Sequence, residues 1–406
     1  MTASHGEFLV RPDPPPHPPG ARTVAAGGYE IIVGAGLLGG IGPFVRSVLP
    51  NAGRALLVHD SALPRAYIDS TAAALGSAGF SVAACPVRAT EDRKSLTTLE
   101  QIFGAAVSAR LERDEPIIAL GGGIVGDVAG FAAATYRRGV PIIHLPTTLL
   151  SMVDASVGGK TAVNIRSAGP NGALSKNMAG AFHRPSLVVC DVSTLHSLPD
   201  RELRSGLAEC IKHALIGADF ADPTLTEFIE QHRSAILARD EATLIKLVAR
   251  NVTIKANCVA RDEFERRHDD SPHGGRMALN CGHTVAHAIE TLPGLLHGAG
   301  DTGDTGLTHG EAVGLGLLAE CAIATRLHLN DAAASTRLQT LLSHCGLPTR
   351  VRGLLPTASI LDRMLDDKKV AGGKLRLALP AADNRCRLVT DPPMGAVAAG
   401  IEAIRA

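Results

Sequence analysis

Short apolar runs alternate with longer helical patterns through the first half of this 406-residue chain, and this alternation constrains the fold most. The runs read as strand candidates because they are short and rich in Ile, Val and Leu. They lie at 29–34, 54–59, 80–85, 116–120, 141–145 and 187–191. Helical patterns stand between them at 62–78, 95–112 and 126–136. Repeated strand–helix–strand order predicts an α/β domain with a parallel sheet and right-handed crossovers.

The pattern changes after about residue 197, where long helical patterns dominate. We expect helices at 201–217, 241–265, 277–292, 309–328 and 332–344, and a hairpin from 374–380 to 385–390. Six prolines at 11–22 preclude regular structure, so residues 1–23 are expected to form a mobile, extended tail. The predicted organisation is this tail, an α/β domain at 24–196 and a mainly α-helical domain at 197–406.

The charge balance excludes some classes of partner. Lys plus Arg and Asp plus Glu each total 40, and Trp is absent, so the basic excess and the stacking platforms of nucleic-acid binders are missing. Eight scattered cysteines without a C-x-x-C pair indicate buried free thiols in a reducing compartment. The N-terminus has no signal-peptide pattern and no apolar run is long enough to span a membrane. We therefore expect a cytoplasmic protein.

A glycine-rich turn, GGGIVGD at 121–127, follows one strand candidate and opens a helical pattern. Glycines let the backbone approach a phosphate, and a helix N-terminus offers free N–H groups, so the turn suits a dinucleotide; a merely tight turn is the alternative. The usual ribose-binding acid about 20 residues later is missing. Asp60 is the best replacement by position, with Glu91 and Lys94 near the same crevice, although plain surface charges fit the spacing equally well.

Histidines at helical spacing occur in LNCGHTVAHAIE, where His283 and His287 are four residues apart and share one helix face. Thr284 stands where a metalloprotease of the H-E-x-x-H type needs its glutamate, which excludes that chemistry. His309 follows a Gly/Asp loop, and Glu209 lies in an otherwise apolar helical pattern. Two histidines and a carboxylate suit an open catalytic zinc site, and satisfied core histidines are the alternative.

Isolated cations with polar neighbours recur along the chain. They are Arg138, Lys160, Lys176 beside Asn177, Lys212, Lys255, and Arg276 four residues before Asn280. Near a metal, such groups suit a polyanionic substrate that carries phosphate and carboxylate. The alternatives are solvated surface charges and, for Glu209 with Lys212, a helix ion pair at i, i+3.

Six ordered segments together resemble the 3-dehydroquinate synthase family, over about residues 28–390. They are ALGGGIVGDVAGFAAATYRRG, LPTTLLSMVDASVGGKTAVN, SLPDRELRSGLAECIK, RMALNCGHTVAHAIE, LTHGEAVGLG and LDDKKVAGGKLRLALP. The resemblance implies an N-terminal NAD-binding α/β domain, a C-terminal helical metal-binding domain and a homodimer. Three loops rich in Gly, Pro, Asp or Ser look like insertions, at 165–175, 266–275 and 296–306, and the first two depart from the pattern of the family.

Site residues follow from the same resemblance. It implies that zinc or cobalt is held by Glu209, His283 and His309. It places NAD against Gly122, Gly123, Asp127, Thr147 and Thr148, with Asp60, Glu91 and Lys94 around the adenosine end. It assigns the substrate to Asp154, Lys160, Asn177, Lys212, Lys255, Arg276, Asn280 and His287, with a phosphate contact from Lys368 or Lys369. Arg138 would reach across the dimer interface, and His287 would handle protons.

The implied reaction belongs to the shikimate pathway, which leads to chorismate and the aromatic amino acids. In it, 3-deoxy-D-arabino-heptulosonate 7-phosphate gives 3-dehydroquinate and phosphate. A ring hydroxyl is oxidised transiently with NAD+ as acceptor, phosphate leaves by β-elimination, the ketone is reduced again, and an intramolecular aldol step closes the carbocycle. Because NAD is regenerated, the enzyme is a carbon–oxygen lyase.

Three alternatives remain open at this point. Cyclases of the amino-dehydroquinate, valiolone or 2-deoxy-scyllo-inosose type share the motifs, but Arg276 with Asn280 favours a substrate with a carboxylate. A metal-dependent polyol or glycerol-phosphate dehydrogenase shares the two-domain plan and a GGG turn, and the cations Lys160, Lys212, Lys255 and Arg276 speak against it. A non-catalytic binding protein of this fold would not need all three metal ligands.

Overall fold

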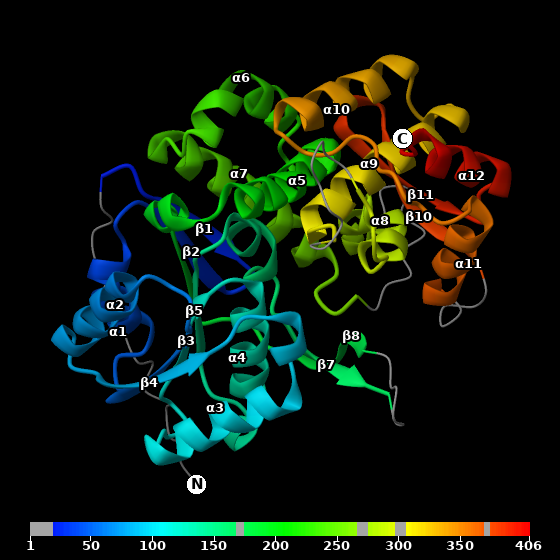
Figure 1. The fold of residues 1–406 in the computed structure, drawn as a ribbon. Helices are drawn as coiled ribbons and strands as arrows, with labels where there is room; N and C mark the ends of the chain where they lie inside the picture. The colour runs from blue at the N-terminus through cyan, green and yellow to red at the C-terminus, as the bar shows by residue number, and fades with distance from the viewer. Residues whose placement is uncertain (1–18, 168–173, 266–274, 297–305, 369–373) are drawn as a thin grey trace, which may run out of the picture. The chain divides into compact units, whose positions relative to one another are not determined.

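The computed structural model describes residues 19–167, 174–265, 275–296, 306–368 and 374–406 (Figure 1). Contacts divide the chain into two compact units. Most of the first consists of Tyr29–Pro146 and Gly159–Ser193, and the second of Thr23–Gly28, Thr147–Gly158 and Thr194–Ala406. The segment 147–158, which the sequence suggested for the α/β domain, therefore packs with the helical unit. Strand β1, Arg22–Ala26, begins inside the expected tail, so Arg22 and Thr23 belong to a regular strand and not to a tail without regular structure.

The first unit contains a parallel sheet with the predicted strands. In the described residues they are β2 Tyr29–Gly34, β3 Arg54–Asp60, β4 Ser81–Val87, β5 Ile117–Gly121, β6 Ile142–Pro146 and β9 Leu187–Asp191. Their order in the sheet is β2-β9-β6-β5-β3-β4, and each neighbouring pair is parallel. Strands β3, β5, β6 and β9 are buried along almost their whole length, which explains why they appear in the sequence as continuous apolar runs, whereas β4 at the edge is largely exposed or half-buried.

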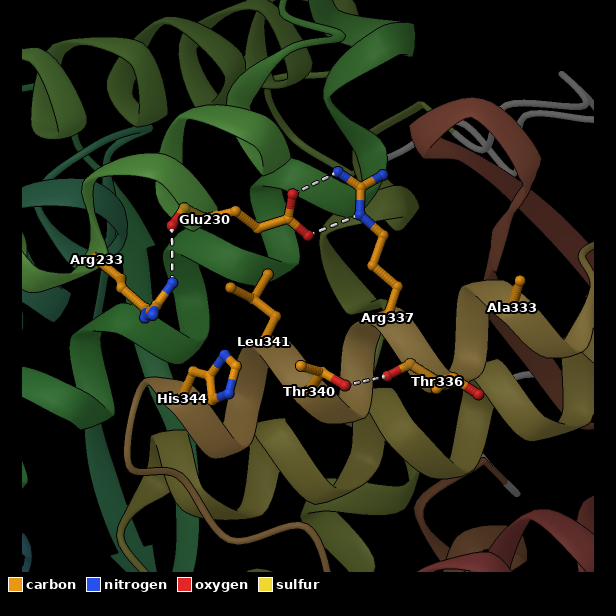
Figure 2. Close-up of a pocket in the computed structure, with 8 residues that line it drawn as sticks. All are labelled: Glu230, Arg233, Ala333, Thr336, Arg337, Thr340, Leu341 and His344. Carbon is orange, nitrogen blue, oxygen red and sulfur yellow. Dashed lines mark hydrogen bonds and ion pairs between the residues drawn. The ribbon is translucent and has the colours of Figure 1, made fainter.

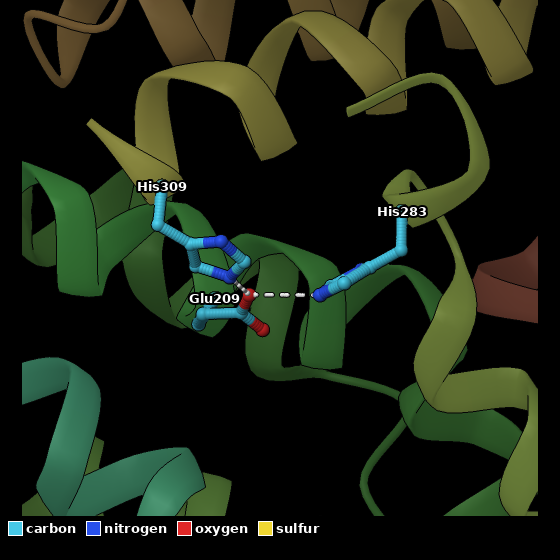
Figure 3. A group of neighbouring side chains, drawn as sticks. All are labelled: Glu209, His283 and His309. Carbon is cyan, nitrogen blue, oxygen red and sulfur yellow. Dashed lines mark hydrogen bonds and ion pairs between the residues drawn. The ribbon is translucent and has the colours of Figure 1, made fainter. Parts of the chain in front are cut away.

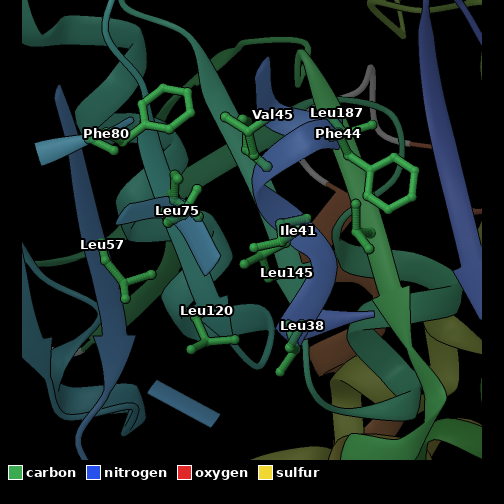
Figure 4. Close-up of a cluster of buried hydrophobic side chains, with 14 of the residues drawn as sticks. Leu38, Ile41, Phe44, Val45, Leu57, Leu75, Phe80, Leu120, Leu145 and Leu187 are labelled. Carbon is green, nitrogen blue, oxygen red and sulfur yellow. The ribbon is translucent and has the colours of Figure 1, made fainter. Parts of the chain in front are cut away.

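Helices cover both faces of this sheet. Helices α1 Ile41–Val48 and α2 Arg65–Ser77 pack on one face, and α3 Leu96–Ser108 and α4 Gly123–Thr135 on the other. Successive strand residues point to opposite faces. Leu57, Leu120 and Leu145 accordingly join the cluster with α1 and α2 (Figure 4), whereas Leu56 and Ala119 join the cluster with α3 and α4. The α/β assignment for this part of the chain is confirmed.

A hairpin that the sequence did not predict follows the sheet strands. Strands β7 Lys160–Arg166 and β8 Leu174–Phe182 pair antiparallel, with an irregularity between Val163 and Ile165. The stretch 165–175 was expected to be a loop, and this is wrong at both ends because the two strands extend into it. Residues 168–173 lie outside the described residues.

The second unit is mainly helical, as expected. Its helices within the described residues are α5 Asp200–Ile216, α6 Leu225–Leu237, α7 Glu241–Arg261, α8 His283–Glu290, α9 His309–Arg326, α10 Ala332–His344, α11 Thr357–Lys368 and α12 Met394–Ala403. The predicted hairpin forms from β10 Arg376–Ala381 and β11 Arg385–Thr390. The helix expected at 277–292 is divided, because Gly282 adopts φ 80° and separates a 3-10 turn at Gly275–Asn280 from α8.

The side chains of the cysteines agree with the sequence-based interpretation, since all eight are buried free thiols. Among the described residues, no helix is both long enough and apolar enough to cross a membrane.

Candidate functional site

Three helices of the second unit bring one carboxylate and two imidazoles together (Figure 3). Glu209 projects from α5, and His283 and His309 are the first residues of α8 and α9. Oε1 of Glu209 lies 3.4 Å from Nε2 of His283 and 3.3 Å from Nε2 of His309. One ligand atom from each residue lies within 4.8 Å of the other two. The structure thus gathers the donor set that the sequence suggested for a metal.

The N-terminus of α9 holds His309 in place. Thr308 caps this helix: its hydroxyl accepts the N–H of Glu311 at 3.3 Å, and its own N–H donates to Oε2 of Glu311 at 2.8 Å. Arg201, on α5, donates to both oxygens of the same carboxylate at 2.8 and 2.7 Å. The N-terminal ends of α5 and α9 are therefore fixed to each other, and His309 is the first residue of α9.

The turn before α8 fixes His283. The N–H of Gly282 donates to Oε2 of Glu320, a fully buried residue of α9, at 2.5 Å. Packing at this point is too close for a side chain, because a Cβ on Gly316 would lie 1.9 Å from the carbonyl oxygen of Gly282. The backbone of α9 thus sets the position at which α8 begins, and with it the position of His283.

Charge compensation around Glu209 shows that the donor set fits a divalent cation. Burial alone would raise the pKa of Glu209, but an ion pair with Lys212 and the neighbouring His283 hold it well below its ordinary value. Burial would lower the pKa of His309, but hydrogen bonds to Glu209 and Glu290 raise it to about 10. The buried carboxylate is therefore ionised, with the Lys212 ammonium on one oxygen and the two imidazoles facing the other. Two imidazoles and one carboxylate are the ligands of an open zinc site.

A second cluster of buried charges centres on Asp154, which lies in the π-helical turn Ser151–Ala155. Nζ of Lys255 contacts its Oδ1 at 2.6 Å and also its backbone carbonyl. Nζ of Lys212 lies 3.8 Å from the same Oδ1. Burial would raise the pKa of Asp154, but Lys255 and Lys212 hold it below its ordinary value. Lys212 thus joins this cluster to the Glu209 carboxylate, and three predicted substrate residues lie together.

Arg276 is buried to 2% exposure, and the structure gives it partners of its own. Its Nε lies 3.2 Å from Oε1 of Glu265, and Nη1 donates to the carbonyl oxygen of Glu263. Asn280, predicted to act with it, lies half-buried in the same 3-10 turn. The guanidinium is therefore paired with a carboxylate of the chain itself, and its predicted role toward a substrate carboxylate stays a prediction.

A separate network in the first unit involves predicted NAD and substrate residues. Lys94 is buried, and its Nζ lies 2.5 Å from Oδ2 of Asp127 and donates to Oδ1 of Asn177. Oδ1 of Asn164 accepts the N–H of Asn177 at 2.9 Å, and its amide nitrogen donates to Oε2 of Glu91 at 3.3 Å. Lys94 and Glu91 are therefore members of a buried or half-buried polar network and not isolated surface charges.

The glycine-rich turn lies where β5 gives way to α4. Gly122 is the N-cap of α4, and Gly123 is its first residue, three residues before the expected start. The first free N–H groups of α4 therefore belong to Gly122 and Gly123, which have no side chain to keep a phosphate away. Asp60 ends β3, where its carboxylate accepts the N–H of Ala62 at 3.0 Å.

The remaining predicted residues are less closely tied to these groups. The Thr148 hydroxyl accepts the N–H of Ser151 at 3.1 Å, and Thr147 is buried beside it in the chain. His287 is exposed on α8, with its ring centroid 5.5 Å from that of His283. The others occupy ends of elements: Arg138 is exposed after α4 with φ 68°, Lys160 is exposed at the start of β7, Lys368 ends α11, and Lys369 lies outside the described residues.

Comparison with known proteins decides the family. Two family models match adjoining parts of the chain, 3-dehydroquinate synthase N-terminal over residues 84–205 and 3-dehydroquinate synthase C-terminal over residues 206–370. The 3-dehydroquinate synthase of Symbiobacterium thermophilum is 39% identical over 378 residues, which cover 93% of this chain and 98% of that protein. This chain belongs to the 3-dehydroquinate synthase family.

Other members and one solved structure extend this result. The 3-dehydroquinate synthase of Desulforamulus reducens is 42% identical over 357 residues, covering 87% of this chain and 90% of that protein. Among solved structures, 2-epi-5-epi-valiolone synthase of Streptomyces hygroscopicus, with NAD+ and Zn2+ bound, is 25% identical. It superposes with a TM-score of 0.77 and covers 94% of this chain and 98% of its own. The family fold predicted from the six segments is confirmed.

Several polar residues around the predicted site residues were not predicted from the sequence. Glu290, whose Oε2 lies 3.5 Å from Nδ1 of His309, orients a predicted ligand from the opposite side. Its position seven residues after His283, on the same helix face, was the available signal. Glu320 and Asn164 had no comparable signal, because their partners are 38 and 13 residues away in the chain.

A surface cavity of about 650 Å³ lies between α6 and α10 of this synthase-family chain (Figure 2). Its lining residues are Glu230, Arg233, Ala333, Thr336, Arg337, Thr340, Leu341 and His344, none of which was predicted to belong to the site. Glu230 holds the Arg337 guanidinium through two contacts of 2.7 Å, and Glu227 adds a third at 2.9 Å. The charge of Arg337 is thereby compensated within the chain, and the cavity does not resemble the buried cationic cluster described above.

Proposed function

We propose that this chain is a 3-dehydroquinate synthase, which converts 3-deoxy-D-arabino-heptulosonate 7-phosphate to 3-dehydroquinate and phosphate. The observation that carries the proposal is the joint presence of family membership and an intact Glu209, His283 and His309 cluster next to buried lysines. A binding protein that had only kept the fold would have no reason to bury these charges, since burial of unneeded charge is costly.

The cofactors proposed are NAD and a zinc or cobalt ion. Glu209, His283 and His309 would hold the metal, and the N-terminus of α4 with Gly122 and Gly123 would receive NAD near its phosphates. When bound, the metal supplies Lewis acidity to a substrate oxygen and NAD accepts and returns a hydride. Asp127, Asp60, Glu91, Lys94, Thr147 and Thr148 are proposed as further NAD contacts.

Substrate binding is proposed for the buried cations. Lys212 and Lys255 face one carboxylate oxygen of Asp154, and their ammonium groups would orient the anionic substrate beside the metal ligands. Arg276 would exchange Glu265 for the substrate carboxylate, and a guanidinium suits this because it binds carboxylates with two parallel hydrogen bonds. His287 would take and return protons near the ring oxygens. Lys160, Asn177, Asn280 and Lys368 complete the proposed contacts.

The organisation of the whole enzyme follows from the same proposal. We propose an NAD-binding domain at 24–196, a metal- and substrate-binding domain at 197–406, and a homodimer in which Arg138 reaches the neighbouring active site. The exposure of Arg138 and its left-handed backbone, φ 68°, are compatible with a side chain directed away from its own sheet.

A second cyclase function is favoured by one observation, the likeness to the valiolone synthase structure at a TM-score of 0.77. Valiolone-type enzymes act on a sugar phosphate without a carboxylate, and buried Arg276 is the residue that argues for the acid substrate. One assay decides between them. Purified protein with NAD+ and Zn2+ or Co2+ should release phosphate from the heptulosonate phosphate and form dehydroquinate. Phosphate release from sedoheptulose 7-phosphate instead would assign the chain to the other cyclases, and accumulation of NADH with either sugar would indicate a dehydrogenase.

A further inference from the structure

His213 is a fully buried histidine on α5 that none of the proposed steps uses. It lies one helical turn after Glu209 and so shares the helix face of that residue. Its Nδ1 lies 3.1 Å from Oδ1 of Asn251, whose amide nitrogen donates to the Leu247 carbonyl at 2.8 Å. The Asn251 oxygen is therefore an acceptor toward the imidazole. This places the proton on Nδ1 and leaves a lone pair on Nε2.

This Nε2 has no hydrogen-bond donor among the described residues. It lies 3.9 Å from Oδ1 of Asp154, the oxygen that Lys255 contacts at 2.6 Å and Lys212 approaches to 3.8 Å. Burial and the neighbouring Lys212 lower the pKa of His213 to about 3, so the ring is neutral in the physiological range. An unmatched buried acceptor costs stability, and apolar side chains of similar shape avoid that cost. An ammonium N–H is the donor that this environment can supply.

Lys212 is the ammonium that would need a new acceptor. It is paired with Oε2 of Glu209, the carboxylate proposed to bind the metal. A divalent cation on Glu209 repels the ammonium and weakens its hydrogen bond to the same carboxylate, so a second acceptor for one of its three N–H groups would stabilise it there. Oδ1 of Asp154 is within reach but already holds Lys255 at 2.6 Å. Nε2 of His213 lies 3.9 Å from the same oxygen and accepts no hydrogen bond from the described residues.

We propose that His213 is a positioning residue whose Nε2 accepts the Lys212 ammonium when a divalent cation occupies Glu209. His213 thereby lets a lysine and a metal ion share one buried carboxylate. The inference rests on the metal site of the proposed function and not on the reaction. If the chain binds Zn2+ but releases no phosphate from any sugar phosphate, the proposed function fails and the role of His213 can still be measured.

The test is the Zn2+ affinity of the full-length chain, measured by competition with a chromophoric chelator, without substrate or NAD. Three substitutions at position 213 separate the roles of the ring. The amide of Gln reaches the place of Nε2, the amide of Asn reaches only that of Nδ1, and Phe keeps the ring without either nitrogen. We expect H213N and H213F to weaken Zn2+ binding by about ten- to a hundredfold, the range for losing a hydrogen bond to a charged group. H213Q should stay within about threefold of the wild type.

A second background shows whether His213 acts through Lys212. In K212M there is no ammonium to accept, so H213N should leave Zn2+ affinity unchanged relative to K212M alone. An equal loss in both backgrounds would show that His213 acts as a ligand or through packing and would overturn the proposal. Equal losses for H213Q and H213N, no loss for H213N, or no Zn2+ binding by the wild type would also overturn it. Thermal unfolding of the metal-free variants identifies any change that is due to folding.

Discussion

Replacing Arg276 by Ala should distinguish recognition of the substrate carboxylate from every other role of this side chain. The guanidinium is 2% exposed and pairs with Glu265 at 3.2 Å, so a substrate carboxylate must replace Glu265 to reach it. Removing one partner of a desolvated charge pair costs about 2–5 kcal/mol. The Glu265 side chain is 41% exposed, so the pair that is given up stabilises the free enzyme by about 1 kcal/mol at most. The net loss should therefore lie in the lower half of the range.

That reasoning gives a loss of about 2–3 kcal/mol, or roughly 30- to 150-fold in kcat/KM for the heptulosonate phosphate. Sedoheptulose 7-phosphate lacks the carboxylate, so its inhibition constant should change by less than about threefold. Arg276→Lys keeps the charge but not the bidentate fork and should fall between the wild type and the Ala variant. The measurements are phosphate release and competitive inhibition, with the metal content of each variant checked. Equal losses for both sugar phosphates would refute the carboxylate role.

Four further results are expected. Removing zinc with a chelator should abolish phosphate release and lower the melting temperature, and added Zn2+ should restore both. The free energy of unfolding should fall by up to about 2.7 kcal/mol when the free metal concentration before removal was a hundred times Kd. Gly316→Ala should destabilise the chain by about 1–3 kcal/mol in urea unfolding because its Cβ would lie 1.9 Å from the Gly282 carbonyl oxygen, whereas Gly314→Ala, which meets only a Leu side chain at 3.4 Å, should be tolerated. Lys94→Met should cost about 3–5 kcal/mol by leaving the carboxylate of Asp127 without its buried partner, and replacing both residues by apolar ones should recover part of the loss. Because the cysteines are buried and burial raises the pKa of the Cys210 and Cys281 thiols, a thiol reagent should react with the native chain only as fast as it unfolds.

The sequence predicted those parts of the structure that depend on local pattern. A strand buried on both faces needs a continuous apolar run, so β5 and β6 were recognisable from their residues alone. The break in the helix before His283 could not be recognised from the sequence. The residues on both sides of Gly282 have a helical pattern, and the helix is interrupted only because this glycine adopts φ 80°. The hairpin β7–β8 was missed for a related reason: glycine and proline between the strands resemble a loop, and only pairing across them shows where the strands end.

For the site, resemblance supplied residues that spacing could not. Glu209 and Lys212 were visible as a pair because they are three residues apart on one helix. Asp154 and Lys255 are separated by 101 residues, and no periodicity indicates that their side chains meet. His213 carried no signal at all, since its significance depends on the hydrogen bond to Asn251 and on what its other nitrogen faces. The chemistry of a single side chain can thus be inferred from the sequence. That several side chains, such as Lys212 and Lys255, contact the same carboxylate can be seen only in the folded structure.

The balance of charge in this cluster explains why metal and substrate should bind together. Asp154 and Glu209 contribute two negative charges and Lys212 and Lys255 two positive ones, and the positive charge of His309 is balanced by Glu290, so these six side chains are neutral together. A divalent cation on Glu209 replaces the proton that His309 carries in the metal-free protein, so it adds one positive charge to a region from which water is largely excluded, where unbalanced charge is costly. An anionic substrate restores the balance, and a phosphate with a carboxylate does so more completely than a neutral sugar. The same argument gives the order of events: the metal makes the site attractive to the anion, so substrate affinity should fall sharply in metal-free protein even though none of the lysines has been changed.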